Sequence, residues 1–343
     1  MTSVKEFRIT EAATPSTLGR GSFVFTDAYS VFDWGVMPDA LPGKGQSLCT
    51  MGAFNFELLE ELGLETHYRG VVVDGDIVTL DAVDEPPCEM AIHLTQVPPL
   101  PHDGRSYDYD AFHREAGLNY LIPLEIIFRN EVPVGSSLRR RTTPADHELD
   151  YDEWPDEVVS LEEPIVEYST KFEKSDRIVS TEEADRIAGP DVSLDDLEAI
   201  ARTVNELVTD RAERAGLIHQ DGKIECLVFE GDVMLADVVG TLDENRFGLD
   251  GTQVSKEVIR QYLKRTQPHW VEAIESAKAQ AREDDIADWK SLCSIEPTPL
   301  SSRAVELASQ MYRAATNAYT QTAWFDTPPL DEVLVTFDSL SDN

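Results

Sequence analysis

Charged side chains alternate along residues 221–225, which read Asp-Gly-Lys-Ile-Glu. In a β-strand Asp221, Lys223 and Glu225 would lie on one face, because successive side chains point to opposite faces. Asp237 ends a second apolar segment. Since Mg²⁺ prefers one or two carboxylates together with phosphate oxygens, Glu225 and Asp237 on paired strands could hold Mg²⁺ with ATP. Lys223 would then neutralise charge on a transferred phosphoryl group. The alternative that the pattern leaves open is a solvent-facing strand.

A second set of charges follows residues 122–128, the most apolar strand-like segment of the chain. Arg129 ends this segment, and a buried guanidinium must find a partner because an isolated charge is costly to remove from water. The guanidinium group suits bidentate recognition of carboxylate or phosphate, so Arg129 is a candidate substrate contact. A structural ion pair with Glu125, which alternation puts on the same face, is the other interpretation. Residues 139–141 are three successive arginines, and both an anion site and a solvated loop remain open for them.

The chain has 65 acidic and 29 basic residues among 343, a formal net charge of −36 that is spread along the sequence, and nine of the basic residues are lysines. Concentrated salt screens such self-repulsion, so the composition predicts a halophilic protein of a salt-accumulating cytoplasm. The same charge argues against nucleic acid as a partner, because that binding neutralises phosphates with cations. We also expect no membrane partner, since no apolar run approaches the ~18 residues of a membrane span. The four widely spaced cysteines are expected to be free thiols.

Common catalytic motifs are missing from the sequence. It has no GxxxxGK[ST] phosphate loop, no GxSxG nucleophile turn and no HExxH metal helix. The seven histidines show no metal-ligand spacing, so we expect structural or solvent-facing roles for them.

The elements that must position these charges form a mixed pattern. Apolar spacing predicts helices over residues 47–62 and 193–215, and a hairpin turn at Asp74-Gly75. Strands are predicted at 223–229 and 233–239, while residues 98–118 break periodicity and are interpreted as a loop or insertion. The chain after residue 255 is mainly helical in pattern, with a proline-rich break at 297–300. Strands and helices without regular alternation favour an α+β fold.

Several motifs follow one another in a fixed order along residues 22–262. Residues 122–130 read IPLEIIFRN and precede the Gly-Ser-Ser of residues 135–137. The alternating segment 221–225 precedes Leu-Ala-Asp at 235–237. Others read ALPGKG at 40–45, LLEELGLETH at 58–67, PIVE at 164–167 and VSKEVIR at 254–260, with Asp243 and Arg246 between the last two. Together they resemble the signatures IPLEVVVRN…GS and DFKLEFG…LADE, and the accompanying motifs, of the phosphoribosylaminoimidazole-succinocarboxamide (SAICAR) synthase family.

The resemblance implies a SAICAR synthase-like α+β fold, two-lobed, with an ATP-grasp-like nucleotide site. It implies an ATP-dependent ligase that joins L-aspartate to the carboxylate of carboxyaminoimidazole ribonucleotide (CAIR), giving SAICAR, ADP and phosphate in purine biosynthesis. ATP and Mg²⁺ would be its cofactors. By position, it implies catalytic roles for Asp221 and Lys223, ATP contacts for Lys5, Lys44, Lys223 and Glu225, and metal ligation by Glu225 and Asp237. It implies contacts to CAIR or aspartate for Arg129, Ser136 or Ser137, Asp243, Arg246, Lys256 and Arg260.

The resemblance also implies limits and leaves alternatives. We expect the chain to divide into a β-rich lobe at 1–97, an ATP-grasp-like substrate and nucleotide domain at 98–262, and a helical extension at 263–343, past the resemblance, packed on the second lobe. The N-terminal phosphate motif lies at residues 4–8, and Ser3 stands where the family has glycine. A small-molecule kinase of related fold and a non-catalytic ribonucleotide-binding paralogue stay open as alternatives. The expected partners are the small-molecule substrates, and a homo-oligomer is left open.

Overall fold

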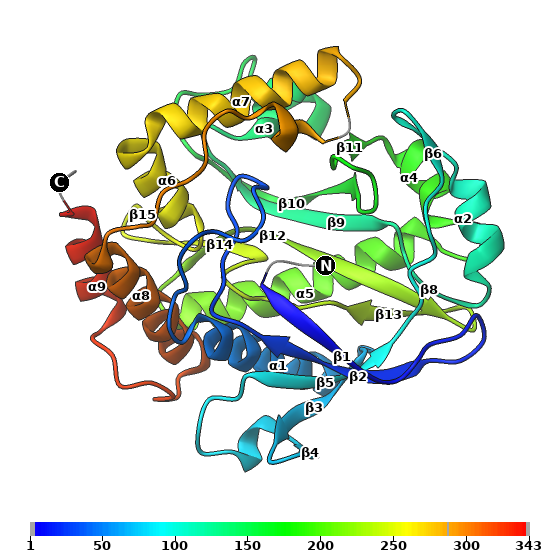
Figure 1. Cartoon of the computed structure of the whole chain (residues 1–343), viewed down its shortest axis with the longest axis horizontal. Coiled ribbons are helices and arrows are strands. Elements are labelled where there is room, and N and C mark those ends of the chain that lie inside the picture. The colour runs from blue at the N-terminus through cyan, green and yellow to red at the C-terminus, as the bar shows by residue number, and fades with distance from the viewer. Residues whose placement is uncertain (1–3, 287, 341–343) are drawn as a thin grey trace.

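Among residues 4–286 and 288–340, which the computed structural model describes, five antiparallel strands form an N-terminal sheet (Figure 1). Their order across the sheet is β1-β2-β5-β3-β4. Helix α1 (Lys44–Glu61) contacts β2, β3 and β5. The strands are β1 (Lys5–Glu11), β2 (Gly19–Phe25), β3 (Tyr68–Val73), β4 (Asp76–Val78) and β5 (Glu89–Leu94).

A larger antiparallel sheet follows the path β11-β10-β9-β12-β14-β15, and both β8 and β13 pair with β12 as well. Strand β12 is therefore bonded to four others and forms the centre of the sheet. A separate hairpin joins β6 (His102–Asp103) to β7 (Ser106–Tyr107). The strands of the larger sheet are β8 (Asn119–Leu121), β9 (Leu124–Val132), β10 (Val159–Thr170), β11 (Ile178–Val179), β12 (Ile218–Phe229), β13 (Asp232–Ala236), β14 (Asn245–Leu249) and β15 (Thr252–Val254).

Helices cover the sheets and close the C-terminal part of the molecule. Helix α5 (Leu194–Arg214) packs along β9, β10 and β12, while α8 (Ser302–Thr320) packs on α1, α5 and α9 (Leu330–Asp338). Helices α6 (Glu257–Thr266) and α7 (Pro268–Glu283) follow β15, and α7 lies at the top of Figure 1. Shorter helices are α2 (Tyr109–Ala116), α3 (Ser137–Arg141) and α4 (Thr181–Ala188), with 3-10 turns at Leu80–Ala82, Pro144–His147 and Trp289–Leu292.

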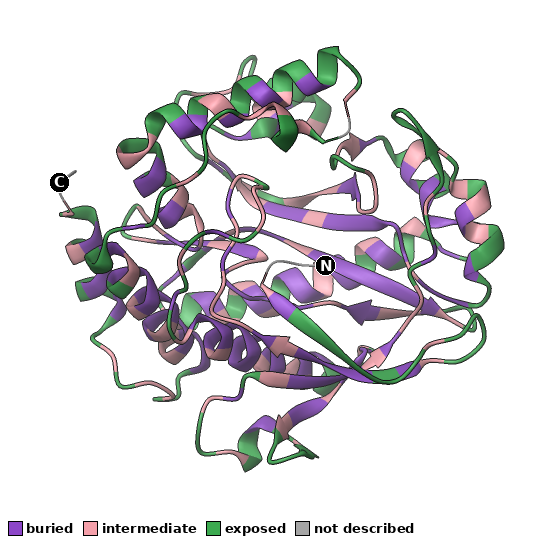
Figure 2. Ribbon diagram, in the orientation of Figure 1, coloured by how far each residue is buried: buried purple, intermediate pink, exposed green. Residues whose placement is uncertain are grey.

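The central strands of the larger sheet separate an apolar face from a polar one. Ile126 and Phe128 of β9 pair with Ile224 and Gly222 of β12, and all three apolar side chains are buried in the main core. Figure 2 shows these strands as mostly buried. A side chain at position 222 would clash with the core, because a Cβ there would lie 2.5 Å from the Phe128 ring. Because side chains alternate, the residues between them point to the opposite face.

The α+β fold and most predicted elements are confirmed. The helices predicted at 47–62 and 193–215 are α1 and α5, and the hairpin at Asp74-Gly75 joins β3 to β4. The predicted strand 223–229 begins earlier, at Ile218, and 233–239 ends earlier, at Ala236. The domain limits at 97 and 262 stay predictions. Ser3 lies outside the described residues.

The interpretation of residues 98–118 as a loop was wrong in part, because they contain β6, β7 and α2. Helix α2 has a recognisable beginning, since the Asp108 side chain accepts a hydrogen bond of 2.8 Å from the Ala111 amide. Phe112 and Ala116, one helical turn apart, are buried in the core. The surrounding prolines and charges masked this short pattern. The four cysteines are free thiols, as expected. Within the described residues, no helix is long and apolar enough to cross a membrane.

Candidate active site

The charged residues singled out in the sequence gather on the polar face of the larger sheet. Strand register pairs Asp221 of β12 with Arg129 of β9 and with Arg246 of β14. In neighbouring rows, β10 places Glu167 beside Ile127, and Ser169 beside Glu125. Asp221, Lys223 and Glu225 thus share one face, as predicted, and the solvent-facing interpretation is wrong because Asp221 and Glu225 are buried.

One end of this face holds a pair of buried carboxylates. Glu225 lies on β12, and Asp237 directly follows the paired strand β13. Burial and the nearby charge of Asp237 raise the pKa of Glu225 to about 8. Burial opposes ionisation of Asp237 too, but the charges of Lys5 and Lys171 outweigh it and lower its pKa. The two carboxylates therefore compete for the same positive charge.

Lysines surround this carboxylate pair. Lys5, at the start of β1, is buried, ion-pairs with Asp237 and lies 4.3 Å from the centre of the Phe23 ring. Lys171 ion-pairs with Glu225, and its Nζ lies 3.1 Å from Glu125 Oε1. The charges of Glu225 and Glu125 outweigh burial and raise the pKa of Lys171 well above its usual value. We call Lys5, Glu125, Lys171, Lys223, Glu225 and Asp237 the lysine end of the site.

Lys223 completes the lysine end from the middle of β12. Its Nζ lies 2.7 Å from Glu125 Oε1 and 3.3 Å from Glu244 Oε2. Burial opposes ionisation of Glu125, but Lys223 and Lys171 outweigh it and lower the pKa of this carboxyl. At neutral pH the lysine end therefore holds lysine ammonium groups against the ionised Glu125 and Asp237 carboxylates, while Glu225, with its pKa of about 8, is mostly protonated. This balance suits the end to bind further anions only together with a cation.

The other end of the polar face is built from arginines, and we call Arg129, Arg141, Glu167, Asp221 and Arg246 the arginine end. Arg129 is 6% exposed, and its Nε donates to Glu167 Oε2 at 2.7 Å. Its Nη1 donates to Asp221 Oδ2 at 3.4 Å. Arg246 binds the same Asp221 through two nitrogens, with Nε–Oδ1 at 2.8 Å, and Arg141 Nη1 donates to Glu167 Oε1 at 2.9 Å.

The alternative ion pair between Arg129 and Glu125 is wrong. The Glu125 carboxylate is engaged by Lys171 and Lys223, while Arg129 is held by Glu167 and Asp221. Sequence spacing could not decide this, because all these side chains project from one face and the neighbouring strands supply nearer partners. Asp221 orients two guanidinium groups, those of Arg129 and Arg246.

A third group of charged residues lies near the beginning of α6 and consists of Lys44, Asp243, Lys256 and Arg260. Lys44 is fully buried, and its Nζ donates to Asp243 Oδ2 at 2.8 Å. Burial opposes ionisation of Asp243, but Lys44 and Lys256 lower its pKa to about 2. Burial lowers the pKa of Lys256 despite the charges of Asp243 and Glu244. Arg260 lies one turn into α6 and pairs with Glu257 at 3.1 Å.

In the loop after β9, some polar residues stabilise the local structure and others are exposed. Ser136 is buried and caps α3, since its hydroxyl accepts from the Leu138 amide at 3.3 Å. Ser137 is exposed. Among the three successive arginines, Arg141 reaches the arginine end, whereas Arg139 binds the Val132 carbonyl at 2.6 Å and stabilises the loop. Arg140 is exposed, as the solvated-loop interpretation expects, and the anion-site interpretation of residues 139–141 stays a prediction.

A buried histidine supports each end from behind. The Nε2 atom of His67 lies 2.9 Å from the Asp237 carbonyl oxygen, and because a carbonyl only accepts, Nε2 carries the proton. Asp237 has a left-handed backbone (φ 62°), which is uncommon for a residue with a side chain. His219 contacts Asn245 and Thr209 at 3.0 and 2.8 Å. Burial lowers the pKa of both histidines to about 4. Their structural roles were expected.

The chain matches known proteins over most of its length. Residues 14–277 match the family model described as SAICAR synthetase. A provisional phosphoribosylaminoimidazole-succinocarboxamide synthase of Archaeoglobus fulgidus is 41% identical over 323 residues, which is 92% of each chain. The chain belongs to the SAICAR synthetase family. The resemblance identified from its motifs is thereby confirmed, and with it the enzyme class of ATP-dependent ligases.

Solved structures of SAICAR synthetases share the fold. The SAICAR-synthase from Saccharomyces cerevisiae complexed with SAICAR superposes with a TM-score of 0.64 at 20% identity, covering 95% of both chains. A SAICAR synthetase in complex with ADP superposes with a TM-score of 0.52 at 23% identity, covering 76% of this chain and 88% of that one. The predicted SAICAR synthase-like fold is confirmed.

Two residues of this charged face were missed from the sequence. Lys171 follows β10 in a segment of ordinary composition, and Glu167 was noted only within a matching motif. The one available signal was scarcity, because the chain has nine lysines among its 343 residues. Five of the nine lie in the site described here: Lys5, Lys44, Lys171, Lys223 and Lys256.

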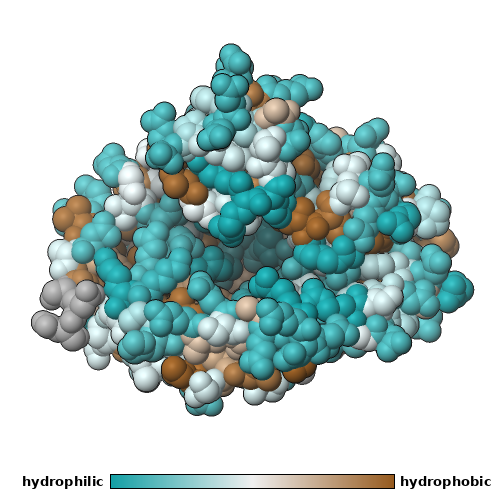
Figure 3. All heavy atoms as spheres, turned by 90° about the horizontal axis from the view of Figure 1, so that it is seen from above, coloured by the Kyte–Doolittle hydropathy of each residue, from teal (hydrophilic) through white to brown (hydrophobic). Residues whose placement is uncertain are grey.

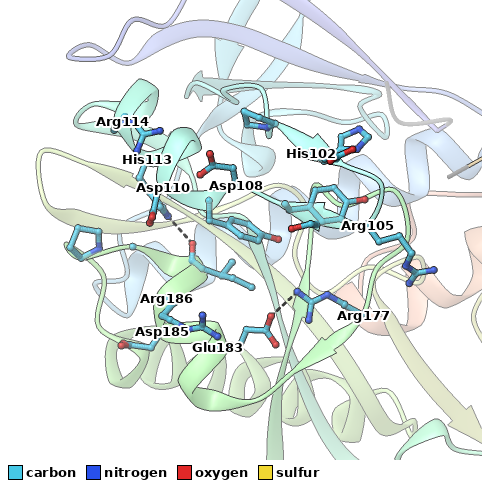
Figure 4. A pocket seen from close by; sticks show the side chains of 18 of the residues that line it. His102, Arg105, Asp108, Asp110, His113, Arg114, Arg177, Glu183, Asp185 and Arg186 are labelled. Carbon is cyan, nitrogen blue, oxygen red and sulfur yellow. Dashed lines mark hydrogen bonds and ion pairs between the residues drawn. The ribbon is translucent and has the colours of Figure 1, made fainter. Parts of the chain in front are cut away.

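Cavities border the site and also lie apart from it. From above, the surface is hollowed near its centre among hydrophilic side chains (Figure 3). A cavity of about 400 Å³ lies next to the segment after Lys171, between residues 173–176, Asp33 and α7. Another of about 1460 Å³ is lined by β6, β7, α2 and α4, and Figure 4 shows Arg177 pointing to Glu183 there. No site residue predicted from the sequence is among the described residues that line this larger cavity.

Proposed function

We propose that this SAICAR synthetase joins L-aspartate to the carboxylate of CAIR with ATP, and that the polar face of the larger sheet is where it does so. One observation carries the proposal. A carboxylate pair surrounded by lysines and a set of oriented guanidinium groups lie on the same face of the larger sheet. A carboxylate is a poor electrophile until it is phosphorylated. The enzyme must therefore place several anions side by side and stabilise the charge that develops between them.

The lysine end fits a magnesium–nucleotide complex. Burial and the nearby charge of Asp237 raise the pKa of Glu225 to about 8, so a divalent cation could replace the proton that the two carboxylates share. Mg²⁺ prefers such carboxylates together with phosphate oxygens, and when bound it would neutralise charge on the phosphates. Within the described part of the chain, no three His, Cys, Asp or Glu side chains are gathered as a ready-made metal site.

Lysines supply the remaining charge for the phosphates. We assign Lys5, Lys171 and Lys223 to the phosphate groups of ATP, with Lys223 nearest the transferred phosphoryl group because it lies between the two ends on β12. Lys44 pairs with Asp243 at the third group, and its assignment to ATP stays a prediction. One solved structure with the same fold holds ADP, the nucleotide product of the proposed reaction.

The arginine end and the third group fit the ribonucleotide and aspartate. Arg129 and Arg246 present guanidinium planes that Asp221 and Glu167 hold in place, which suits bidentate contacts to carboxylate or phosphate. Lys256 and Arg260 lie at the first turn of α6, where the helix dipole also favours an anion. The proposed contacts to CAIR or aspartate are Arg129, Ser136, Ser137, Asp243, Arg246, Lys256 and Arg260.

One assay distinguishes this ligase from the alternatives. The protein is incubated in concentrated KCl with CAIR, L-aspartate, ATP and Mg²⁺, and both phosphate and SAICAR are measured. We expect SAICAR and phosphate to form together and only when aspartate is present. Turnover of ATP to ADP without aspartate would indicate a kinase, and ribonucleotide binding without any turnover would indicate a non-catalytic paralogue.

We also propose that the protein works in the cytoplasm of a salt-accumulating cell. The formal net charge of −36 is the support, because self-repulsion of this size destabilises a compact chain unless salt screens it. The melting temperature should therefore fall when molar KCl is diluted to millimolar concentration. An unchanged melting temperature would contradict the halophilic proposal without touching the proposed reaction.

A further inference from the structure

Helix α8 lies beyond residue 277, where the match to the family model ends. We propose that α8 is part of the catalytic apparatus, as the element that positions the loop of residues 237–244. Tyr312 and Tyr319 are the positioning residues. The inference rests on the proposed function, because that loop begins with the proposed metal ligand Asp237 and carries the proposed substrate contact Asp243.

Tyr312 fixes the end of the loop that carries Asp243. The Tyr312 hydroxyl donates to Asp243 Oδ1 at 2.7 Å, while Lys44 Nζ donates to the other oxygen, Oδ2, at 2.8 Å. Tyr312 and Lys44 are both fully buried. Burial and the charge of Asp243 raise the pKa of Tyr312 well above its usual value, so its hydroxyl keeps the proton that it donates. The Asp243 carboxylate is thereby held between α1 and α8.

Tyr319 fixes the middle of the loop through Asn55. The Tyr319 hydroxyl donates to Asn55 Oδ1 at 2.9 Å, and Asn55 Nδ2 donates to the Val239 carbonyl at 3.2 Å. All three residues are buried. Gly240 approaches Asn55 so closely that a Cβ would lie 2.2 Å from Nδ2, and its φ of 70° also favours glycine. The loop backbone is therefore shaped to receive this support.

The two tyrosines act from one face of one helix. They are seven residues apart, which is about two turns, so both side chains point toward α1 and the loop. A movement of α8 would shift Asp243 and the backbone after Asp237 together. Because Asp243 is a proposed substrate contact, such support acts on substrate binding and not only on stability.

Conservative hydroxyl deletions test the inference in the full-length protein. The variants are Tyr312→Phe and Tyr319→Phe, with Tyr262→Phe as the matched control. The Tyr262 side chain is also buried, but its hydroxyl lies 3.2 Å from Ser301 Oγ at the beginning of α8, away from the loop. We measure kcat, KM for CAIR, CAIR binding by calorimetry without ATP, the melting temperature, and hydrogen exchange of the backbone amides at 238–245.

Tyr312→Phe should raise KM and the Kd for CAIR by about tenfold while kcat changes less than about twofold, because one oxygen of Asp243 loses its partner. Tyr319→Phe should speed exchange of the 238–245 amides by about tenfold. Tyr262→Phe should lower the melting temperature as much as the other two variants do. It should change neither CAIR binding nor the exchange of the 238–245 amides.

Native CAIR binding in Tyr312→Phe together with native exchange in Tyr319→Phe would overturn the inference and leave α8 a purely structural helix. The wild-type protein serves as the separate check on the proposed function. If it forms no SAICAR, the proposed reaction fails, whereas the exchange measurement still decides whether α8 holds the loop.

Discussion

The lysine end and the arginine end lie on the same strands, yet they hold their charges differently. At the lysine end Glu125 is shared by Lys171 and Lys223, two point charges on flexible stems. At the arginine end Asp221 and Glu167 bind planar guanidinium groups through several atoms each. The difference indicates that the first end suits a group whose charge moves during the reaction. The second suits a group that must keep one orientation.

This contrast matters more in a chain so poor in lysine. Exposed acidic surface accounts for most of the charge, and arginine supplies most of the cations elsewhere. Lysine has been kept where a compact, rotatable ammonium group faces carboxylates at the site. Replacing arginine by lysine, or lysine by arginine, should therefore affect the two ends differently.

Asp237→Asn should have the largest effect, because it removes a carboxylate from the proposed Mg²⁺ pair. We expect kcat to fall about 100- to 1000-fold, while the Kd for CAIR stays native, since the arginine end is untouched. Turnover is measured by SAICAR formation and binding by calorimetry. Asp232→Asn, at the exposed beginning of β13, is the control. Native turnover in Asp237→Asn would show that the lysine end holds no metal.

Arg129→Lys should have a smaller effect, confined to the arginine end. The lysine keeps the charge but loses the planar fork, so KM for CAIR should rise about tenfold with a modest loss of stability. Arg202→Lys on α5, where the guanidinium pairs with Glu198 one turn away, controls for the exchange itself. A lower melting temperature with a native KM would mean that Arg129 is only the core partner of Glu167 and Asp221.

The two supporting histidines predict the smallest effect, on the pH dependence of stability. Burial lowers their pKa from 6.5 to about 4, so the unfolded chain takes up their protons first and stability falls as the pH drops through this range. Each should contribute about 1.4 kcal/mol per pH unit to the slope of the free energy of unfolding. The free energy of unfolding is measured by urea titration at several pH values. His67→Gln and His219→Gln should each remove the contribution of one histidine to the slope, whereas His269→Gln, at an exposed position, should leave the slope unchanged. Equal slopes in all variants would contradict the assignment.

The sequence predicted the shared face of Asp221, Lys223 and Glu225 because alternation along a strand is a local rule. It could not predict which carboxylate meets which cation, since Arg129 chooses partners from β10 and β12 that lie 38 and 92 residues away. Lys171 was missed for the same reason. Its position next to Glu225 depends on how β10 ends, and no local pattern encodes that. The contacts of Tyr312 needed the packing of α8 on α1.

The alternation of side chains between the two faces of β12 limits where the chain can accept an inserted residue. Its odd-numbered positions from 221 to 225 carry the site, and even-numbered Gly222 and Ile224 carry the core. A single inserted residue in this strand would exchange the two sets, burying an ammonium group among apolar side chains and emptying the site at once. Four neighbouring strands would lose register in the same event. Length variation among relatives is therefore expected outside β12, for example in the segment 98–118, and not within the strand itself.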